Sequence, residues 1–267
     1  MRFLIDQKEF NEKEIRTVWK AILTGDQSTK LEFYKILEAL QMKLRNDDIA
    51  LIIDLFGKDI EPASFMRQEI ECVSKLTQYC QRQTTAVTNA AELFFDIACQ
   101  TKPYSSEIVE TAMDKLINLL LQQDRALKIE YISRCYDRLE KGESSFQCVR
   151  LISKVLEQIP KEKMGALISG QEIALDLISK YDLITLVIFD LSKYSELANA
   201  EFTKFTGPSE NFESTEVLGL PFSHRVNIAT RLQLVKLLLN YSATAIEEEQ
   251  LDSIWDILMT RSQISTD

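Results

Sequence analysis

The chain has 267 residues, of which 45% are hydrophobic and 27% are charged. This balance is typical of a folded globular protein and excludes a disordered or collagen-like chain as the dominant state. The formal net charge of −10 would repel a polyanion, so we expect no nucleic acid partner. Seven glycines and five prolines are few for this length, which disfavours a β-sandwich or barrel and favours long helices with short connections.

Two further features bear on where the protein acts. The apolar run Phe3–Ile5 is too short for a signal peptide, and no stretch approaches the ~18 apolar residues of a membrane span. The cysteines fall inside helical apolar patterns, and their odd number leaves one unpaired in any full disulfide scheme. They are Cys72, Cys80, Cys99, Cys135 and Cys148. We expect reduced thiols, no membrane insertion and a cytoplasmic location, with the nucleus as the alternative.

The first predicted helices follow from cap residues and the 3.6-residue apolar period. Asn11 can cap the first helix, which ends near Gly25, and Ser28 can cap the second. A short third helix is predicted over Asp48–Phe56, with Gly57 ending it. A longer helix should follow Pro62, where a first-turn proline is tolerated, and continue to Cys80.

The middle of the chain predicts four amphipathic helices separated by short gaps. The clearest covers Ser105–Gln122, with Ser105 or Ser106 as its cap and apolar residues in a double column four residues apart. One helix precedes it, between Val87 and Ala98. A third helix ends at Gly142, and a fourth begins at Ser144 or Ser145 and ends before Pro160.

Toward the C-terminus, 173–194 is apolar enough for two helices interrupted near Tyr181 and Asp182. The last two helices are predicted over Phe222–Tyr241 and Glu247–Arg261. About eleven helices with short links indicate sequential antiparallel pairs. Because two helices and their turns take about 40 residues, we predict an all-α fold, an irregular α-solenoid of HEAT or armadillo type, as a single domain over 1–267.

The segment Ser195–Glu216 departs from the helical pattern and contains Gly207-Pro208, so it is predicted as a flexible acidic loop. One interpretation is a tolerated insertion whose aromatic side chains attach it to the helices, and its deletion would then leave the fold intact. The other is a segment that binds a protein partner. The candidate partner-binding residues are Phe202, Phe205, Glu210, Phe212 and Glu213.

The sequence gives little support for catalysis. A cysteine nucleophile needs an adjacent base, and the single histidine, His224, begins a predicted helix with no cysteine placed beside it. We expect this histidine to be structural. The cysteine spacings do not fit a zinc site and the glycines form no phosphate loop, so we expect no catalytic residue, metal or cofactor. Trp19, Trp255 and Met42 lie on apolar faces and are expected in the core.

Several stretches of the C-terminal third resemble a known family. In order they are Leu177–Tyr194 (LISKYDLITLVIFDLSKY), Leu218-Gly219, Phe222-Ser223-His224, Ile228–Leu239 (IATRLQLVKLLL) and Ile254–Leu258. Their order and spacing resemble the long non-catalytic region of very large ubiquitin-specific proteases of the fat facets type. The stretch Ala90–Leu139, with Gln123-Asp124-Arg125 and Tyr131–Arg134, is similar to the preceding part of that region.

The resemblance implies a segment of a deubiquitinase, a thiol protease whose separate catalytic domain cleaves the isopeptide bond after ubiquitin. No cysteine box, histidine box or paired Cys-X-X-Cys knuckle of that domain is present, so no catalytic residue is carried over. The segment would then be a scaffold for protein partners, namely substrates or regulators. The alternative is an unrelated HEAT- or armadillo-like adaptor, for example in a ubiquitin ligase or a trafficking complex. A self-contained helical enzyme is the third hypothesis.

Overall fold

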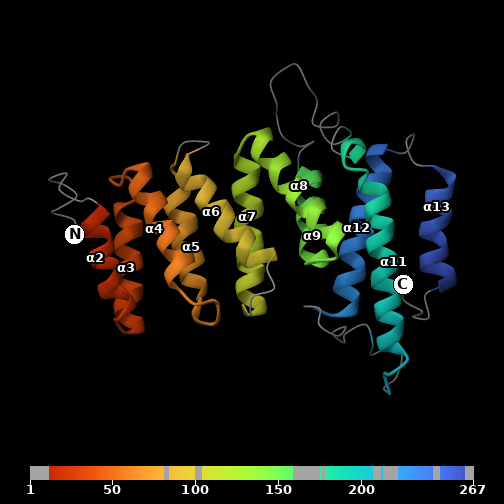
Figure 1. Ribbon diagram of the computed structural model, residues 1–267, viewed down its shortest axis with the longest axis horizontal. Coiled ribbons are helices and arrows are strands. Elements are labelled where there is room, and N and C mark those ends of the chain that lie inside the picture. Colours follow the sequence, from red (N-terminus) through yellow and green to blue (C-terminus); the bar gives the residue numbers. More distant parts are fainter. Residues whose placement is uncertain are drawn as a thin grey trace. The chain divides into compact units, whose positions relative to one another are not determined.

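The computed structural model describes residues 12–80, 84–99, 104–158, 175, 178–206, 212, 222–242 and 247–261. Within these ranges the chain is helical and contains no β-strand (Figure 1), which confirms the all-α prediction. The predicted cap Asn11 lies outside the described residues. The chain divides into two compact units, 1–124 and 125–267. That 1–267 forms a single domain stays a prediction.

The described residues of the N-terminal unit form three consecutive helix pairs. Its elements are α2 (Glu12–Leu23), α3 (Gln27–Leu40), α4 (Asn46–Asp59), the 3-10 turn η1 (Pro62–Ser64), α5 (Arg67–Thr77), α6 (Thr85–Cys99) and α7 (Ser106–Gln122). The pairs α2/α3, α4/α5 and α6/α7 each join through a short connection and are antiparallel (Figure 1). The predicted antiparallel pairing is confirmed here.

The first helices of the three pairs form one layer of this unit. Trp19 of α2 packs edge-on against Phe56 of α4, with ring centroids 4.9 Å apart. The Asn89 amide of α6 donates to the Ala50 carbonyl of α4 over 3.1 Å. Each pair therefore stacks on the next through its first helix, as expected for a helical repeat.

The second helices form the other layer. The hydroxyl of Tyr34, in the middle of α3, donates to the carboxylate of Glu69, near the start of α5, over 3.0 Å. One to two turns later in both helices, Lys75 Nζ lies 2.7 Å from Glu38 Oε2. Because contacts advance in step along both helices, α3 and α5 run parallel. This is the arrangement that stacking of antiparallel pairs requires.

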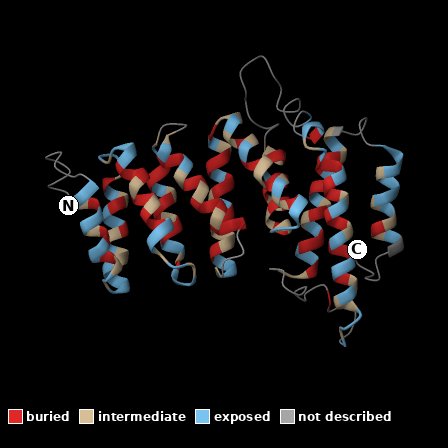
Figure 2. Ribbon diagram, viewed as in Figure 1, coloured by how far each residue is buried: buried red, intermediate tan, exposed pale blue. Residues whose placement is uncertain are grey.

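The core of this unit lies between the two layers, and most of the α6 ribbon is buried (Figure 2). Helix α6 occupies the centre and contacts α4, α5 and α7. Its alanines Ala86, Ala90, Ala91 and Ala98 are at most 1% exposed. Small side chains at these positions allow neighbouring helices to approach closely, since interhelical distance depends on the residues at the contact.

The C-terminal unit repeats the same plan. Its elements are α8 (Arg125–Lys141), α9 (Ser145–Gln158), α11 (Leu183–Phe202), α12 (His224–Ser242), α13 (Glu248–Trp255) and the π-helical η4 (Asp256–Arg261). Phe146 and Phe222, near the starts of α9 and α12, have ring centroids 4.8 Å apart. Near the ends of the same helices, the Tyr241 hydroxyl donates to the Leu156 carbonyl over 3.4 Å. Helices α9 and α12 are therefore parallel neighbours, and α11 contacts both α8 and α12.

The predicted end of α8 at Gly142 is confirmed in detail. The Gly142 N–H donates to the Leu139 carbonyl over 3.0 Å, and the Glu143 N–H donates to the Arg138 carbonyl over 2.8 Å. This pair of bonds is a Schellman motif, which needs a left-handed residue at its turn. Gly142 supplies it with φ 71°, a conformation that glycine adopts without a steric penalty.

Other predicted boundaries have mixed outcomes. Ser105 caps α7 as predicted. The Ser28 cap is wrong: α3 begins earlier, and the Asp26 carboxylate accepts the Thr29 N–H over 2.8 Å. Gly57 does not end its helix, because α4 continues to Asp59. A single glycine costs a helix interior only about 1 kcal/mol, which packing readily offsets.

The start of the predicted acidic loop is also wrong. The predicted interruption near Asp182 is present, with φ 41° at this residue, but α11 then runs without a break to Phe202. Residues 195–202 therefore belong to the helix. Leu191, Tyr194 and Ala198 share its buried face at helical spacing. The pattern was weak in the sequence because Ala198 is small and polar residues surround it.

Candidate interaction site

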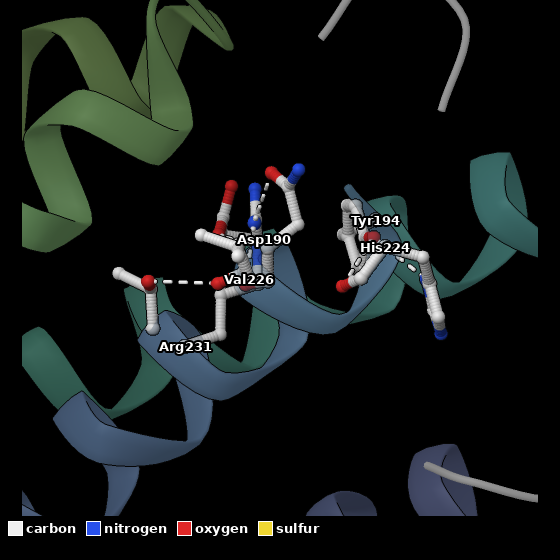
Figure 3. A network of polar contacts seen from close by, with 7 residues as sticks. Asp190, Tyr194, His224, Val226 and Arg231 are labelled. Atoms are coloured by element: carbon white, nitrogen blue, oxygen red, sulfur yellow. Dashed lines mark hydrogen bonds and ion pairs between the residues drawn. The ribbon is translucent and has the colours of Figure 1, made fainter. Parts of the chain in front are cut away.

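A buried polar network joins α11 to α12 in the C-terminal unit (Figure 3). Arg231 Nε donates to Asp190 Oδ2 over 2.8 Å, with side chains only 2% and 7% exposed. Arg231 Nη1 also donates to the Asn227 carbonyl over 3.1 Å. The guanidinium carbon lies 4.2 Å from the centre of the Tyr194 ring. The cation is therefore compensated by a carboxylate, a carbonyl and an aromatic face, which lets it remain charged in the core.

The single histidine belongs to the same network. His224 is the first residue of α12 and is 1% exposed. Its Nδ1 lies 2.8 Å from the Tyr194 hydroxyl, and the two rings are stacked at an angle of 10°. The imidazole thus ties the start of α12 to the middle of α11. His224 lies at a helix start, as predicted, and its structural role stays a prediction.

The structure brings together three of the five candidate partner-binding residues. Phe212 is 1% exposed, and its ring centroid lies 5.2 Å from Phe202, 5.5 Å from Phe205 and 5.3 Å from His224. Phe202 and Phe205 are partly buried against the same core cluster. These contacts match the interpretation in which aromatic side chains attach the segment to the helices.

The other two candidates, Glu210 and Glu213, lie outside the described residues. Partner binding through the segment stays a prediction. Phe212 itself is covered by the protein's own side chains, so a partner would have to use other residues or displace it.

The five cysteines are mostly buried. All are free thiols; Cys80 is half-buried and the other four are buried. Burial raises the pKa of the Cys72 thiol and that of Cys80. Because the thiolate is the reactive form, a raised pKa lowers reactivity at neutral pH. Among the described residues, no group of three or more His, Cys, Asp or Glu side chains is placed to hold a metal ion.

An exposed apolar row runs along the last helical segment. Leu251 and Trp255 are four residues apart on α13, and Met259 follows after the same interval in η4. Their exposed fractions are 44%, 65% and 60%. Residues at this spacing lie on the same side of a helix, so the three side chains form a continuous apolar face. We call Leu251, Trp255 and Met259 the α13 face.

Two predictions of core residues are wrong. Trp255, on the α13 face, is largely exposed, and Met42, just after α3 in the other unit, is 71% exposed. Trp19, by contrast, is 2% exposed as predicted, and its indole N–H donates to Asp59 Oδ2 over 2.8 Å. An apolar helical period shows that a face is apolar. It does not show whether another helix covers that face, so no signal in the sequence separates Trp19 from Trp255.

The stacked antiparallel pairs define an armadillo-like helical repeat. The model of the UBP24/USP9X/USP9Y ARM repeat family matches residues 1–267, and the chain belongs to this family. The chain is thus an ARM repeat region and not a catalytic domain. The relation to ubiquitin-specific proteases that the C-terminal stretches indicated is confirmed.

The chain is also similar to a Drosophila melanogaster protein named "Probable ubiquitin carboxyl-terminal hydrolase FAF", with 21% identity over 280 residues. The match covers 100% of this chain and 10% of that protein, so the chain spans about a tenth of the length of its curated relative. No solved structure matches the chain significantly. Among the described residues, no helix is long and apolar enough to span a membrane.

Proposed function

We propose that the chain is a non-catalytic scaffold of a large deubiquitinase, which binds protein partners and brings them to a protease domain elsewhere in the polypeptide. The family match and the likeness to a protein named as a ubiquitin hydrolase support the link to deubiquitination. The partners would be substrates or regulators of the protease. The alternative of an unrelated adaptor loses its support, because the family description covers all of 1–267.

The α13 face is the observation that carries the binding role. Tryptophan is enriched at the energetic centres of protein interfaces, where it supplies a large apolar area with few rotatable bonds. A Trp side chain that is 65% exposed, between two exposed aliphatic side chains on the same row, is suited to such a contact. A scaffold also needs no reactive group, in keeping with the buried thiols.

The non-catalytic half of the proposal is tested with a ubiquitin probe that carries a cysteine-directed warhead. The purified chain should remain unlabelled under conditions in which a ubiquitin-specific protease domain reacts fully. Labelling at any cysteine that is lost on changing His224 would contradict the proposal, because it would reveal a working Cys/His pair.

The binding half is tested by capture of proteins from cell lysate, with mass spectrometry as the readout. Trp255→Ala should remove partners that wild type captures, with thermal unfolding unchanged. Tyr79→Ala is the matched control, because Tyr79 is 59% exposed and lies in the other unit. Equal capture by wild type and both variants would exclude the α13 face, and no specific capture by wild type would exclude the scaffold function.

We also propose a cytoplasmic location, with the nucleus as the alternative. Imaging of the fluorescently tagged full-length parent protein tests this. Accumulation inside a secretory compartment would contradict it.

A further inference from the structure

The parallel helices α9 and α12 border a groove whose lining has more cations than anions. The groove has a volume of about 550 Å³. Side chains from one face of each helix line it: Arg150, Ser153, Lys154 and Glu157 from α9, and Arg225, Val226, Ala229, Thr230 and Gln233 from α12. Three cations therefore face one anion, in a chain whose net charge is −10.

The walls of the groove are held in place at both ends. The Phe146–Phe222 ring contact fixes the beginnings of α9 and α12, and the Tyr241–Leu156 hydrogen bond fixes their ends. The Arg231–Asp190 pair anchors α12 to α11 on its buried side. A preformed groove binds a ligand without the entropic cost of ordering its own walls.

The cationic character is only partly compensated inside the groove. Lys154 Nζ lies 3.5 Å from Glu157 Oε2, which is a loose ion pair between partly exposed side chains. Arg225 is exposed, and it has no ion-pair partner among the residues that the structure describes. An anionic group entering the groove would meet a guanidinium without displacing a competing carboxylate from it.

One residue of the groove lining, Ser153, has a buried hydroxyl without a hydrogen-bond partner. Ser153 is 2% exposed, and its Oγ atom makes no hydrogen bond. Buried polar atoms in folded proteins nearly always have a partner, so such an atom in the lining of a groove is a position at which a ligand can complete the bonding. A hydroxyl beside cations donates favourably to a carboxylate oxygen.

We propose that this α9–α12 groove binds an acidic peptide segment of a partner protein, with a carboxylate accepting from Ser153 Oγ and lying close to Arg150, Lys154 and Arg225. The inference rests on the proposed scaffold function, since it names the chemical class of one partner. Three cations are too few, and the overall charge too negative, for the extended phosphate contacts that nucleic acid binding uses. A short run of Asp and Glu fits the groove and its charge better.

The test uses fluorescence anisotropy of a labelled twelve-residue peptide that alternates Glu and Gly. A peptide with Gln in place of Glu is the uncharged control. The 267-residue chain should bind the acidic peptide, bind the Gln peptide at least about tenfold more weakly, and lose affinity as salt rises from 50 to 300 mM. Absence of binding to the acidic peptide at 50 mM salt overturns the proposal.

Two variants locate the site. The first is a triple variant in the groove, which should weaken binding at least about tenfold. It combines Arg150→Glu, Lys154→Glu and Arg225→Glu. The matched control reverses Lys13, Arg16 and Lys20 on one face of α2, which changes the net charge equally and leaves the groove intact. If both triple variants weaken binding equally, the effect is one of overall charge and the groove is not the site.

The hydroxyl is tested separately, which keeps the proposal falsifiable if the groove triple variant does not fold. Ser153→Ala should weaken binding about tenfold, the loss of one hydrogen bond to a charged group. Ser253→Ala removes an exposed serine on α13 and should change nothing. Unchanged affinity in Ser153→Ala, or preferential binding of a twelve-nucleotide single strand over the peptide, overturns the proposal. The scaffold function is affected only if the lysate capture by the unmodified chain also fails.

Discussion

Arg231 of α12 and Asp190 of α11 form a buried ion pair with 2.8 Å between Nε and Oδ2. The two residues are 41 positions apart in the sequence, and their pairing fixes the relative position of two helices that border the C-terminal core. Arg231 also donates to the Asn227 carbonyl and lies over the Tyr194 ring, and the Tyr194 hydroxyl is hydrogen-bonded to His224 beside the pair.

Removing one partner of this pair should be strongly destabilising. Asp190→Ala leaves the Arg231 charge buried without its carboxylate, and we expect a loss of about 3–5 kcal/mol in the free energy of unfolding. Urea unfolding followed by circular dichroism measures it. Glu32→Ala is the control, because its pair with Lys35 is exposed and worth less than about 1 kcal/mol. Equal effects of the two substitutions would show that the buried pair is not needed to position α12.

Phe212 should contribute to the core of the C-terminal unit. Phe212→Ala removes a ring packed against Phe202, Phe205 and His224, and we expect a loss of about 3–5 kcal/mol. The control is Phe189→Ala, whose ring is 46% exposed, with an expected loss below about 1 kcal/mol. Differential scanning calorimetry distinguishes the two.

The extent of α11 and the burial of Phe212 change the expected result of deleting Ser195–Glu216. That deletion removes the end of α11, including the buried Ala198, together with Phe212. We now expect it to unfold the C-terminal unit, contrary to the expectation from sequence. Cooperative unfolding at the wild-type temperature after the deletion would show that the helix end and Phe212 are dispensable.

The thiols should differ in their accessibility to alkylation. Cys80 is half-buried, whereas Cys72, Cys99, Cys135 and Cys148 are buried. With iodoacetamide at neutral pH, we expect Cys80 to be modified first and the others only after urea unfolding, because burial limits access and raises the pKa of Cys72. Peptide mass spectrometry identifies the modified sites. Rapid modification of Cys72 in the native protein would contradict the packing of α5 against α3.

Glu69 should make the stability of the N-terminal unit depend on pH. The residue is 2% exposed, and burial raises the pKa of its carboxyl, although hydrogen bonds from the Met66 N–H and Tyr34 hydroxyl act in the opposite direction. The folded state therefore holds the proton more tightly than the unfolded state. The associated stability is fully present below the unfolded pKa of about 4.3, and it is lost as the pH rises through the folded pKa.

The measurement compares wild type with Glu69→Gln, which keeps the shape and removes the titration. From about pH 4 to pH 7, the free energy of unfolding of wild type should fall relative to that of the variant. Urea unfolding at several pH values gives both curves. A difference that stays constant, or that changes in the opposite direction, would mean that the carboxylate form is the one the fold stabilises.

Much of the secondary structure follows from local chemistry, and here prediction from sequence succeeds. Gly142 ends α8 because the left-handed turn suits glycine, and Ser105 caps α7 because its hydroxyl accepts a backbone N–H. The apolar period predicted most helices for the same reason, since one face must be buried. The family resemblance also lies in these stretches, particularly around Leu177–Tyr194 and Ile228–Leu239.

The predictions from sequence that proved wrong share a different cause. Trp19 and Trp255 both lie on apolar helical faces, yet the first is covered by α4 and the second is exposed. Residues 195–202 looked like a loop, but contact with neighbouring helices supports them as part of α11. Asp190 and Arg231 give no sequence signal of their pairing, because polar residues on a helix usually face solvent.

The amino-acid sequence alone determined that this protein is a series of amphipathic helices, because periodicity and caps act over a few residues. Only the tertiary structure decided which apolar faces are covered, which charges are paired in the core, and where a cationic groove opens between α9 and α12. These features depend on residues tens of positions apart being brought together, and packing between helices, not local propensity, sets that arrangement.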